Sequence, residues 1–219
     1  MSDSPWARDS SRRKGAPPSG RIIEIVTVVL LALATVGSAW SAYQVTRWNG
    51  VETDEARVSG AHRIDASRAY ALATQTIAYD SAAVSQYAQA VTSEDVRLQQ
   101  FIRETIIRPD FLPIIESWQQ QIDAGELPTN LLENQEYLDD LLAPSQDADE
   151  KALAASVRSE EAGDNADDYI RLTLFFASAL FFAGITASFR TRLPKLLLVV
   201  AAGAILAVAG GLLVGYPVA

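Results

Sequence analysis

The chain has 219 residues, no cysteine, one histidine and a formal net charge of −9. The single histidine excludes metal sites built from several histidines, and the acidic balance argues against nucleic acid, which basic side chains bind. Mean hydropathy near zero conceals three apolar runs on either side of a strongly acidic middle, so the composition predicts an all-α integral membrane protein with three transmembrane helices.

Residues 1–20 carry several arginines and are expected to form a disordered basic cytoplasmic tail. The first transmembrane helix is predicted at residues 21–43, because about 20 apolar residues are needed to cross the hydrocarbon core. A cleaved signal peptide is the alternative, but the long preceding tail and the long apolar run favour an uncleaved anchor. Glu24 lies near the cytoplasmic edge of this run, where a solvated or paired carboxylate is favoured over a proton or ion relay.

The stretch WSAYQVTRWNG at 40–50 follows the first apolar run. Aromatic rings prefer the headgroup level of a bilayer, and an arginine there can extend its guanidinium to lipid phosphates. We therefore predict a membrane-interface group, with a contact between subunits or with a specific lipid as the alternative. The group consists of Trp40, Tyr43, Arg47 and Trp48, and Arg171 is expected at the same interface.

Residues 44–168 are predicted to form an acidic α-helical extracytoplasmic domain, with 24 acidic and 9 basic residues and a net charge of −15. No strong helix breaker separates Tyr43 from Val91, so the first transmembrane helix should continue as one long helix. Its expected packing stripe consists of Ala66, Ala69, Ala73, Ile77, Val84, Ala88 and Val91.

Short amphipathic helices are expected next. A capping box from Thr92 to Asp95 should start the first of them, and the prolines of RPDFLP at 108–113 should break it. Asn130 should open another short helix, and Ser145 should cap the start of the last helix of the domain.

The last helix of this domain has small residues at heptad spacing, which lets two helix backbones approach closely. The alanine-rich face of the first long helix is the expected partner, so the two helices should extend from the membrane as an antiparallel helical stalk or coiled coil. The predicted helix-packing residues are Ala148, Ala152, Ala155, Ser159, Ala162 and Ala166.

The second and third transmembrane helices are predicted at 169–189 and 195–216, joined by a cytoplasmic loop at 190–194. Basic residues in the tail and in this loop predict that both lie in the cytoplasm. Residues 217–219 are then expected to form an extracytoplasmic C-terminus. The chain is thus predicted to be a multi-pass inner-membrane protein. A small residue at every fourth position of the third helix predicts close helix packing, favoured within the chain over between subunits. These residues are Gly203, Ala207, Gly211 and Gly215.

Three stretches together resemble an uncharacterised family of bacterial inner-membrane proteins. They are WSAYQVTRWNG at 40–50, RPDFLPIIESW at 108–118 and YIRLTLFFASALFFAGI at 169–185. The resemblance covers most of residues 22–215 and implies one N-terminal span, an α-helical outer domain and two C-terminal spans. It implies no activity.

No sequence motif for a nucleotide, a cofactor or a calcium loop is present. The preferred interpretation is a non-enzymatic membrane protein that acts as an assembly, scaffold or sensing subunit through its outer helical domain. Its expected partners are membrane lipid and either another copy or another membrane protein, with no catalytic, cofactor or metal site. The alternatives are a component of an oligomeric channel or transporter and, last, an enzyme that uses carboxylates such as Asp80, Glu104 or Glu116.

Overall fold

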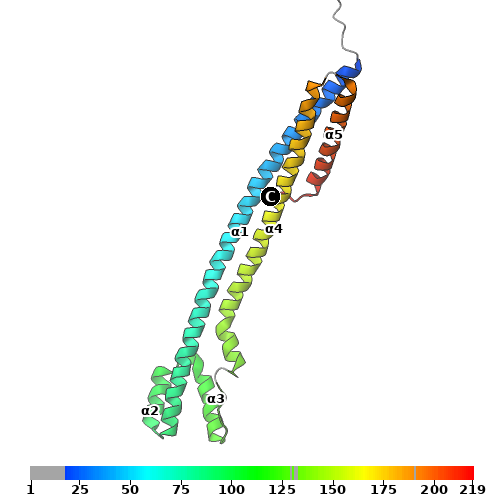
Figure 1. Cartoon of the computed structure of the whole chain (residues 1–219). Coiled ribbons are helices and arrows are strands. Elements are labelled where there is room, and N and C mark those ends of the chain that lie inside the picture. Colours follow the sequence, from blue (N-terminus) through cyan, green and yellow to red (C-terminus); the bar gives the residue numbers. More distant parts are fainter. Residues whose placement is uncertain (1–17, 129, 131–132, 190) are drawn as a thin grey trace, which may run out of the picture. The chain divides into compact units, whose positions relative to one another are not determined.

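The computed structural model describes residues 18–219 except 129, 131, 132 and 190. Residues 1–17 of the tail predicted at 1–20 therefore lie outside the described residues. The described chain is all-helical (Figure 1). Its helices are α1 (Pro18–Thr92), α2 (Val96–Phe101), α3 (Leu112–Asp123), α4 (Gln135–Ile185) and α5 (Arg192–Gly215). Short helical turns connect some of them: the π-helix η1 (Ile102–Ile106) and the 3₁₀ helices η2 (Pro109–Phe111) and η4 (Thr186–Ser188).

The chain divides into two units, and α1 and α4 contribute residues to both. Unit 1 comprises Met1–Glu52 and Glu160–Ala219, and unit 2 comprises Thr53–Ser159. Each unit has its own buried core. The long helix predicted from Tyr43 to Val91 is confirmed, because α1 continues to Thr92.

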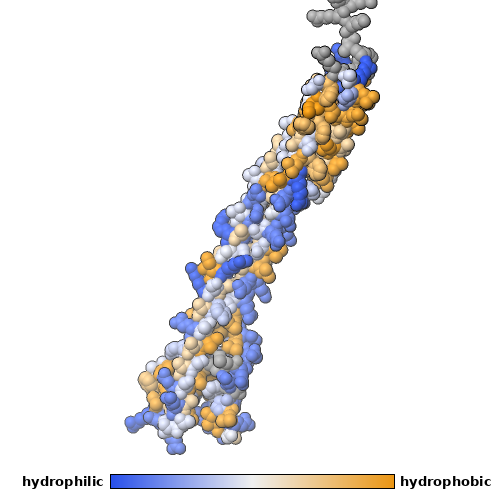
Figure 2. All heavy atoms as spheres, viewed as in Figure 1, coloured by the Kyte–Doolittle hydropathy of each residue, from blue (hydrophilic) through white to orange (hydrophobic). Residues whose placement is uncertain are grey.

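Unit 1 contains the apolar parts of three helices. In the described chain, α1, α4 together with η4, and α5 are each long and apolar enough to cross a membrane, which confirms three candidate spans. On the face shown in Figure 2, hydrophobic side chains gather over these parts of the helices. Residues of α1, α4 and α5 share one core that consists of Ala34, Tyr169, Leu172, Phe176, Ala179 and Ala209.

The face of α1 that enters this core is built from small and polar residues, a stripe that the sequence analysis missed. Ala34, Gly37, Ser41 and Gln44 recur at spacings of three, four and three, and all four are buried. At Gly37 the backbone of α1 lies close to α4, since a Cβ atom there would lie 2.5 Å from the Phe176 ring. Glycine at this position lets the ring of α4 lie against the backbone of α1.

Gln44 is a buried polar residue of unit 1. Its side chain is fully buried, and neither its Oε1 nor its Nε2 has a hydrogen-bond partner among the described residues. Ser41, one turn earlier, is also buried but donates to the carbonyl of Gly37 at 2.9 Å. A buried amide without partners costs about 1–3 kcal/mol, so Gln44 reduces the stability of this core.

In unit 2, α1 and α4 pack antiparallel through two seams of small residues. Ser59 donates to the carbonyl of Ala152 at 2.9 Å, and Arg158 donates to Glu55 at 3.0 Å. The earlier residue of α1 therefore contacts the later residue of α4, as expected for antiparallel helices. The buried positions of α1 recur every seven residues, at Ser59, Ala66, Ala73, Asp80 and Tyr87. The facing positions of α4 are Ser145, Ala148, Ala152 and Ala155.

The stripe predicted for α1 is therefore partly wrong. Ala88 is exposed, and Asp80 and Tyr87 occupy the buried face in its neighbourhood. An apolar pattern does not reveal this face, because its seven-residue repeat includes a serine and an aspartate that are buried with hydrogen-bond partners.

Two predicted helix caps, at Thr92 and Ser145, are also wrong. The Thr92 hydroxyl bonds back to the carbonyls of Ala88 and Gln89, and Asp95 instead caps α2 by accepting from the Leu98 amide at 3.0 Å. The short helix predicted to open at Asn130 falls partly on residues 131 and 132, which lie outside the described residues; the Glu133 amide donates to the Asn130 carbonyl at 2.9 Å, and α4 begins at Gln135. The Ser145 hydroxyl bonds to the Leu142 carbonyl inside α4, which continues through Pro144 without interruption.

The remaining core of unit 2 is formed where α2, η1, η2 and α3 cover the C-terminal part of α1 and the first turns of α4. α3 ends before Gly125, which has a φ of +78° and so takes the left-handed conformation that favours glycine. The buried residues are Ala83, Val84, Tyr87, Ala90, Ile102, Ile107, Phe111, Ile115 and Tyr137.

Candidate functional site

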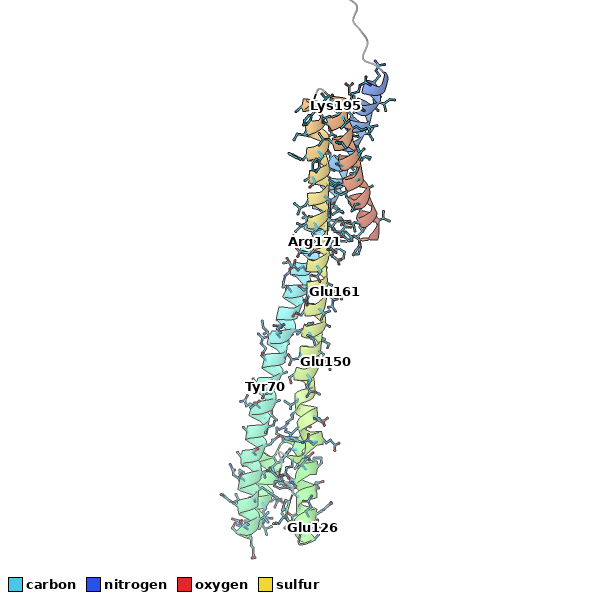
Figure 3. All side chains as sticks on the ribbon, turned by 45° about the vertical axis from the view of Figure 1, so that its right-hand side comes forward. Tyr70, Glu126, Glu150, Glu161, Arg171 and Lys195 are labelled. Atoms are coloured by element: carbon cyan, nitrogen blue, oxygen red, sulfur yellow. The ribbon has the colours of Figure 1, made fainter. Side chains whose placement is uncertain are left out.

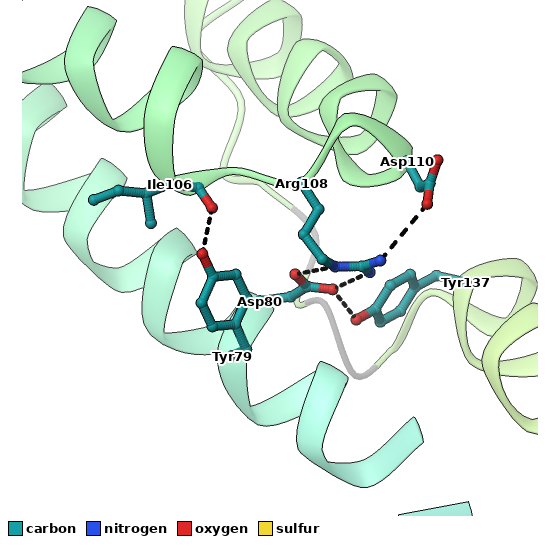
Figure 4. A network of polar contacts seen from close by, with 6 residues as sticks. All are labelled: Tyr79, Asp80, Ile106, Arg108, Asp110 and Tyr137. Atoms are coloured by element: carbon teal, nitrogen blue, oxygen red, sulfur yellow. Dashed lines mark hydrogen bonds and ion pairs between the residues drawn. The ribbon is translucent and has the colours of Figure 1, made fainter. Parts of the chain in front are cut away.

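A buried ion pair connects three separate parts of unit 2. The carboxylate of Asp80 on α1 is fully buried and accepts two hydrogen bonds from Arg108, from Nε at 3.0 Å and from a terminal nitrogen at 2.6 Å (Figure 4). The hydroxyl of Tyr137 on α4 donates to the same carboxylate at 2.7 Å. A second carboxylate, Asp110, lies 3.7 Å from the outer side of the guanidinium.

Local sequence positions each partner of Asp80. Arg108 precedes Pro109, so its backbone is extended, with ψ at 144°, and it leaves the helical path between η1 and η2. Tyr137 lies in the first turn of α4, where the Asn134 side chain accepts a hydrogen bond from its amide at 3.1 Å. Beside the pair, the Tyr79 hydroxyl donates to the carbonyl of Ile106 at 2.7 Å and ties η1 to α1 (Figure 4).

Arg108 and Tyr137 both retain their protons in this network. The hydrogen bonds from Arg108 to Asp80 raise the pKa of Arg108 above its ordinary value. Burial, together with the hydrogen bond to Asp80, raises the pKa of Tyr137 well above its ordinary value. Tyr137 is therefore a neutral hydrogen-bond donor at physiological pH, and Asp80 serves to join three segments.

The three carboxylates considered as enzyme candidates do not converge on one cleft. Asp80 is enclosed by Arg108 and Tyr137. Glu116 pairs with Arg103 at 2.6 Å on the surface, and Glu104 accepts a hydrogen bond from Gln100 at 2.9 Å.

Next to the network lies a cavity of about 690 Å³ between α3 and the start of α4. Its volume falls in the range of small-molecule sites. Among the described residues, no group of three or more histidine, cysteine or acidic side chains is placed to hold a metal ion. The cavity is lined by Arg108, Asp110, Pro113, Ile114, Ser117, Trp118, Gln121, Asn134, Glu136, Tyr137, Asp140 and Leu141.

The structure separates the predicted membrane-interface residues. Trp40 and Tyr43 are exposed, and their ring centroids lie 5.9 Å apart. Trp48 is instead partly buried: it packs against the core of unit 1, and its indole nitrogen donates to the carbonyl of Pro217 at 3.3 Å. Arg47 is exposed, and Arg171, marked on α4 in Figure 3, pairs with Asp168 at 2.7 Å.

The predicted packing residues of α4 and α5 lie in different environments. Five of the six residues on α4 are buried and Ser159 is partly buried: Ala148, Ala152, Ala155, Ser159, Ala162 and Ala166. On α5, the buried face instead consists of Val199, Ala202 and Ala209. In the small-residue face, Gly203 is partly buried and Ala207, Gly211 and Gly215 are exposed, and a Cβ atom added at any of its glycines would have no neighbour within 4 Å.

Sequence reasoning missed the network around Asp80. Asp80 was named only as one of three unplaced carboxylates, and Arg108 and Tyr137 were not connected with it. One signal was available, because Asp80 falls in the seven-residue repeat that starts at Ser59. A charged residue at a repeat position that should be buried requires an opposite charge from elsewhere in the fold.

Comparison of the chain with protein-family models, with curated proteins and with solved structures found no match in any of the three. The resemblance to a family of three-span inner-membrane proteins therefore stays a prediction.

Proposed function

We propose that this chain is a non-enzymatic, three-span inner-membrane protein that acts as an assembly, scaffold or sensing subunit through an acidic helical domain outside the cytoplasm. The proposal assigns unit 2 to the extracytoplasmic side, because basic residues flank the predicted spans on the opposite side. The observation that carries it is the cavity between α3 and α4, which lies beside a buried network joining three segments. A domain with this construction suits binding, since its surface is fixed before a partner arrives.

The orientation can be tested directly because the chain has no cysteine. Ser117, which lines the cavity, and Thr191, which precedes α5, are both exposed. We expect a membrane-impermeant maleimide to label Ser117→Cys in spheroplasts, and to label Thr191→Cys only after the membrane is opened. The reverse pattern would place unit 2 in the cytoplasm and contradict the proposal.

The assembly part of the proposal is supported by the open small-residue face of α5. Faces of this kind allow close packing with another helix in lipid. We expect the protein to have a native mass in mild detergent above that of one 23.7 kDa chain. Gly211→Leu should reduce this mass, because it adds bulk to the face.

Gly184→Leu is the matched control. Gly184 lies near the end of α4, and a Cβ atom there would also meet nothing within 4 Å, but it is outside the α5 face. It should leave the mass unchanged. A wild-type protein that is strictly monomeric, or an equal effect of both variants, would argue against assembly through α5.

A further inference from the structure

The cavity between α3 and α4 has a charge pattern that selects among ligands. Arg108 is the only basic residue among the described lining residues. Its Nε and one terminal nitrogen already donate to Asp80. Three carboxylates also line the cavity, from Asp110, Glu136 and Asp140. The lining therefore has an excess of negative charge, which disfavours an anionic ligand.

Two of these carboxylates are not neutralised by the protein. Asp110 lies 3.7 Å from Arg108, but among the described residues Glu136 and Asp140 have no basic side chain within ion-pair distance. They are four residues apart on α4, so their side chains share one face of the helix. Like charges at this spacing repel each other slightly, and a bound cation would relieve that repulsion.

The α3 wall of the cavity combines apolar and aromatic side chains with the polar Ser117 and Gln121. α3 contributes Pro113, Ile114 and Trp118, and the Trp118 ring is only partly buried. The face of an indole attracts cations, and an ammonium or guanidinium group is held there more strongly when it is partly removed from water. An apolar stem attached to the cation would find a matching surface on Ile114.

We infer that this cavity binds an organic cation, a guanidinium or ammonium group carried on an apolar stem, with the charge between Trp118 and the carboxylates of Glu136 and Asp140. A simple metal ion fits less well, since among the described residues no three acidic side chains are placed to hold one. The same chemistry can come from a free small amine or from an arginine or lysine side chain of a peptide. This inference goes beyond the proposed function, because it does not depend on which side of the membrane unit 2 faces.

The test uses the full chain in mild detergent and isothermal titration calorimetry at fixed ionic strength. The probes are agmatine as the free guanidinium compound, a capped Gly-Arg-Gly peptide as the peptide form, and magnesium chloride as the simple cation. We expect saturable binding of one or both guanidinium probes and none of magnesium. The stronger of the two guanidinium probes identifies the source of the ligand.

The double variant Glu136→Gln with Asp140→Asn should weaken binding by about tenfold or more, which corresponds to about 1.4 kcal/mol. Its matched control is Asp139→Asn with Glu150→Gln, which removes the same charge from exposed positions of α4 outside the cavity. Trp118→Leu should weaken binding by about fivefold through loss of the aromatic face. The single variant Asp140→Asn serves if the double variant does not fold.

Absence of saturable binding by the wild-type chain would overturn the inference. Equal weakening by the cavity variant and by the control variant would also overturn it, because it would show a general attraction of cations to an acidic domain. Either result leaves the proposed function untouched, since that is tested by labelling and by native mass.

Discussion

Arg108→Met should lower the free energy of unfolding of unit 2 by about 3–5 kcal/mol, because it leaves a buried carboxylate without its counter-charge. The Asp80 side chain is only 1% exposed, and after the change its remaining partner would be the Tyr137 hydroxyl. Hydrogen exchange of the full chain in detergent, followed by mass spectrometry, measures this locally. Peptides from residues 102–123 should lose protection, while peptides from unit 1 serve as the internal reference.

The surface pair of Arg103 and Glu116 is the matched control for this prediction. It also joins an arginine to a carboxylate at 2.6 Å, but its side chains are 42% and 54% exposed. Arg103→Met should therefore cost less than about 1 kcal/mol. The double variant Asp80→Leu with Arg108→Met should recover most of the lost protection, since no unpaired charge remains in the core. A small loss in Arg108→Met, equal to that of Arg103→Met, would show that the buried pair does not hold the segments of unit 2 together.

Gly37→Ala should destabilise unit 1 by about 1–3 kcal/mol, although alanine is the better helix former by about 1 kcal/mol. The added methyl group would lie 2.5 Å from two atoms of the Phe176 ring. Phe176 is 3% exposed and packed in the core of unit 1, so the ring can move only by displacing other side chains. The thermal midpoint of the full chain in detergent, followed by circular dichroism, should fall.

Gly50→Ala is the control on the same helix and in the same unit. A Cβ atom at Gly50 would have no neighbour within 4 Å, so helix propensity alone acts there and the midpoint should rise slightly. Combining Gly37→Ala with Phe176→Leu should restore part of the loss by making room for the methyl group. A rise in both single variants would mean that α1 and α4 do not approach closely at Gly37.

The predicted helices followed from local physical chemistry and needed no knowledge of the fold. Long apolar runs identified the three candidate spans, and the absence of breakers in α1 predicted a helix that the structure extends to Thr92. Local capping was less reliable. Thr92 and Ser145 both turn their hydroxyls back to carbonyls of their own helices, a choice that depends on whether the helix continues.

Partnerships between distant residues were decided only by the tertiary structure. Asp80 lies in α1, Arg108 follows the π-helix η1, and Tyr137 lies in the first turn of α4. No spacing in the sequence indicates that these three side chains meet. The open face of α5 is a similar case. A small residue at every fourth position indicates that a helix can pack closely. Which face meets the other helices of the chain depends on how the helix is rotated against them. In the structure, the buried face of α5 consists of Val199, Ala202 and Ala209.

By itself the sequence determined the helical class, the three apolar helices and the acidic character of unit 2, because hydrophobic length and charge are properties of each segment alone. The tertiary structure decided which polar groups are buried, where the cavity forms and which helix faces stay open. The physical reason is that burial of a charge or of a small-residue face is a relation between segments, and its free energy depends on partners that the sequence places far away.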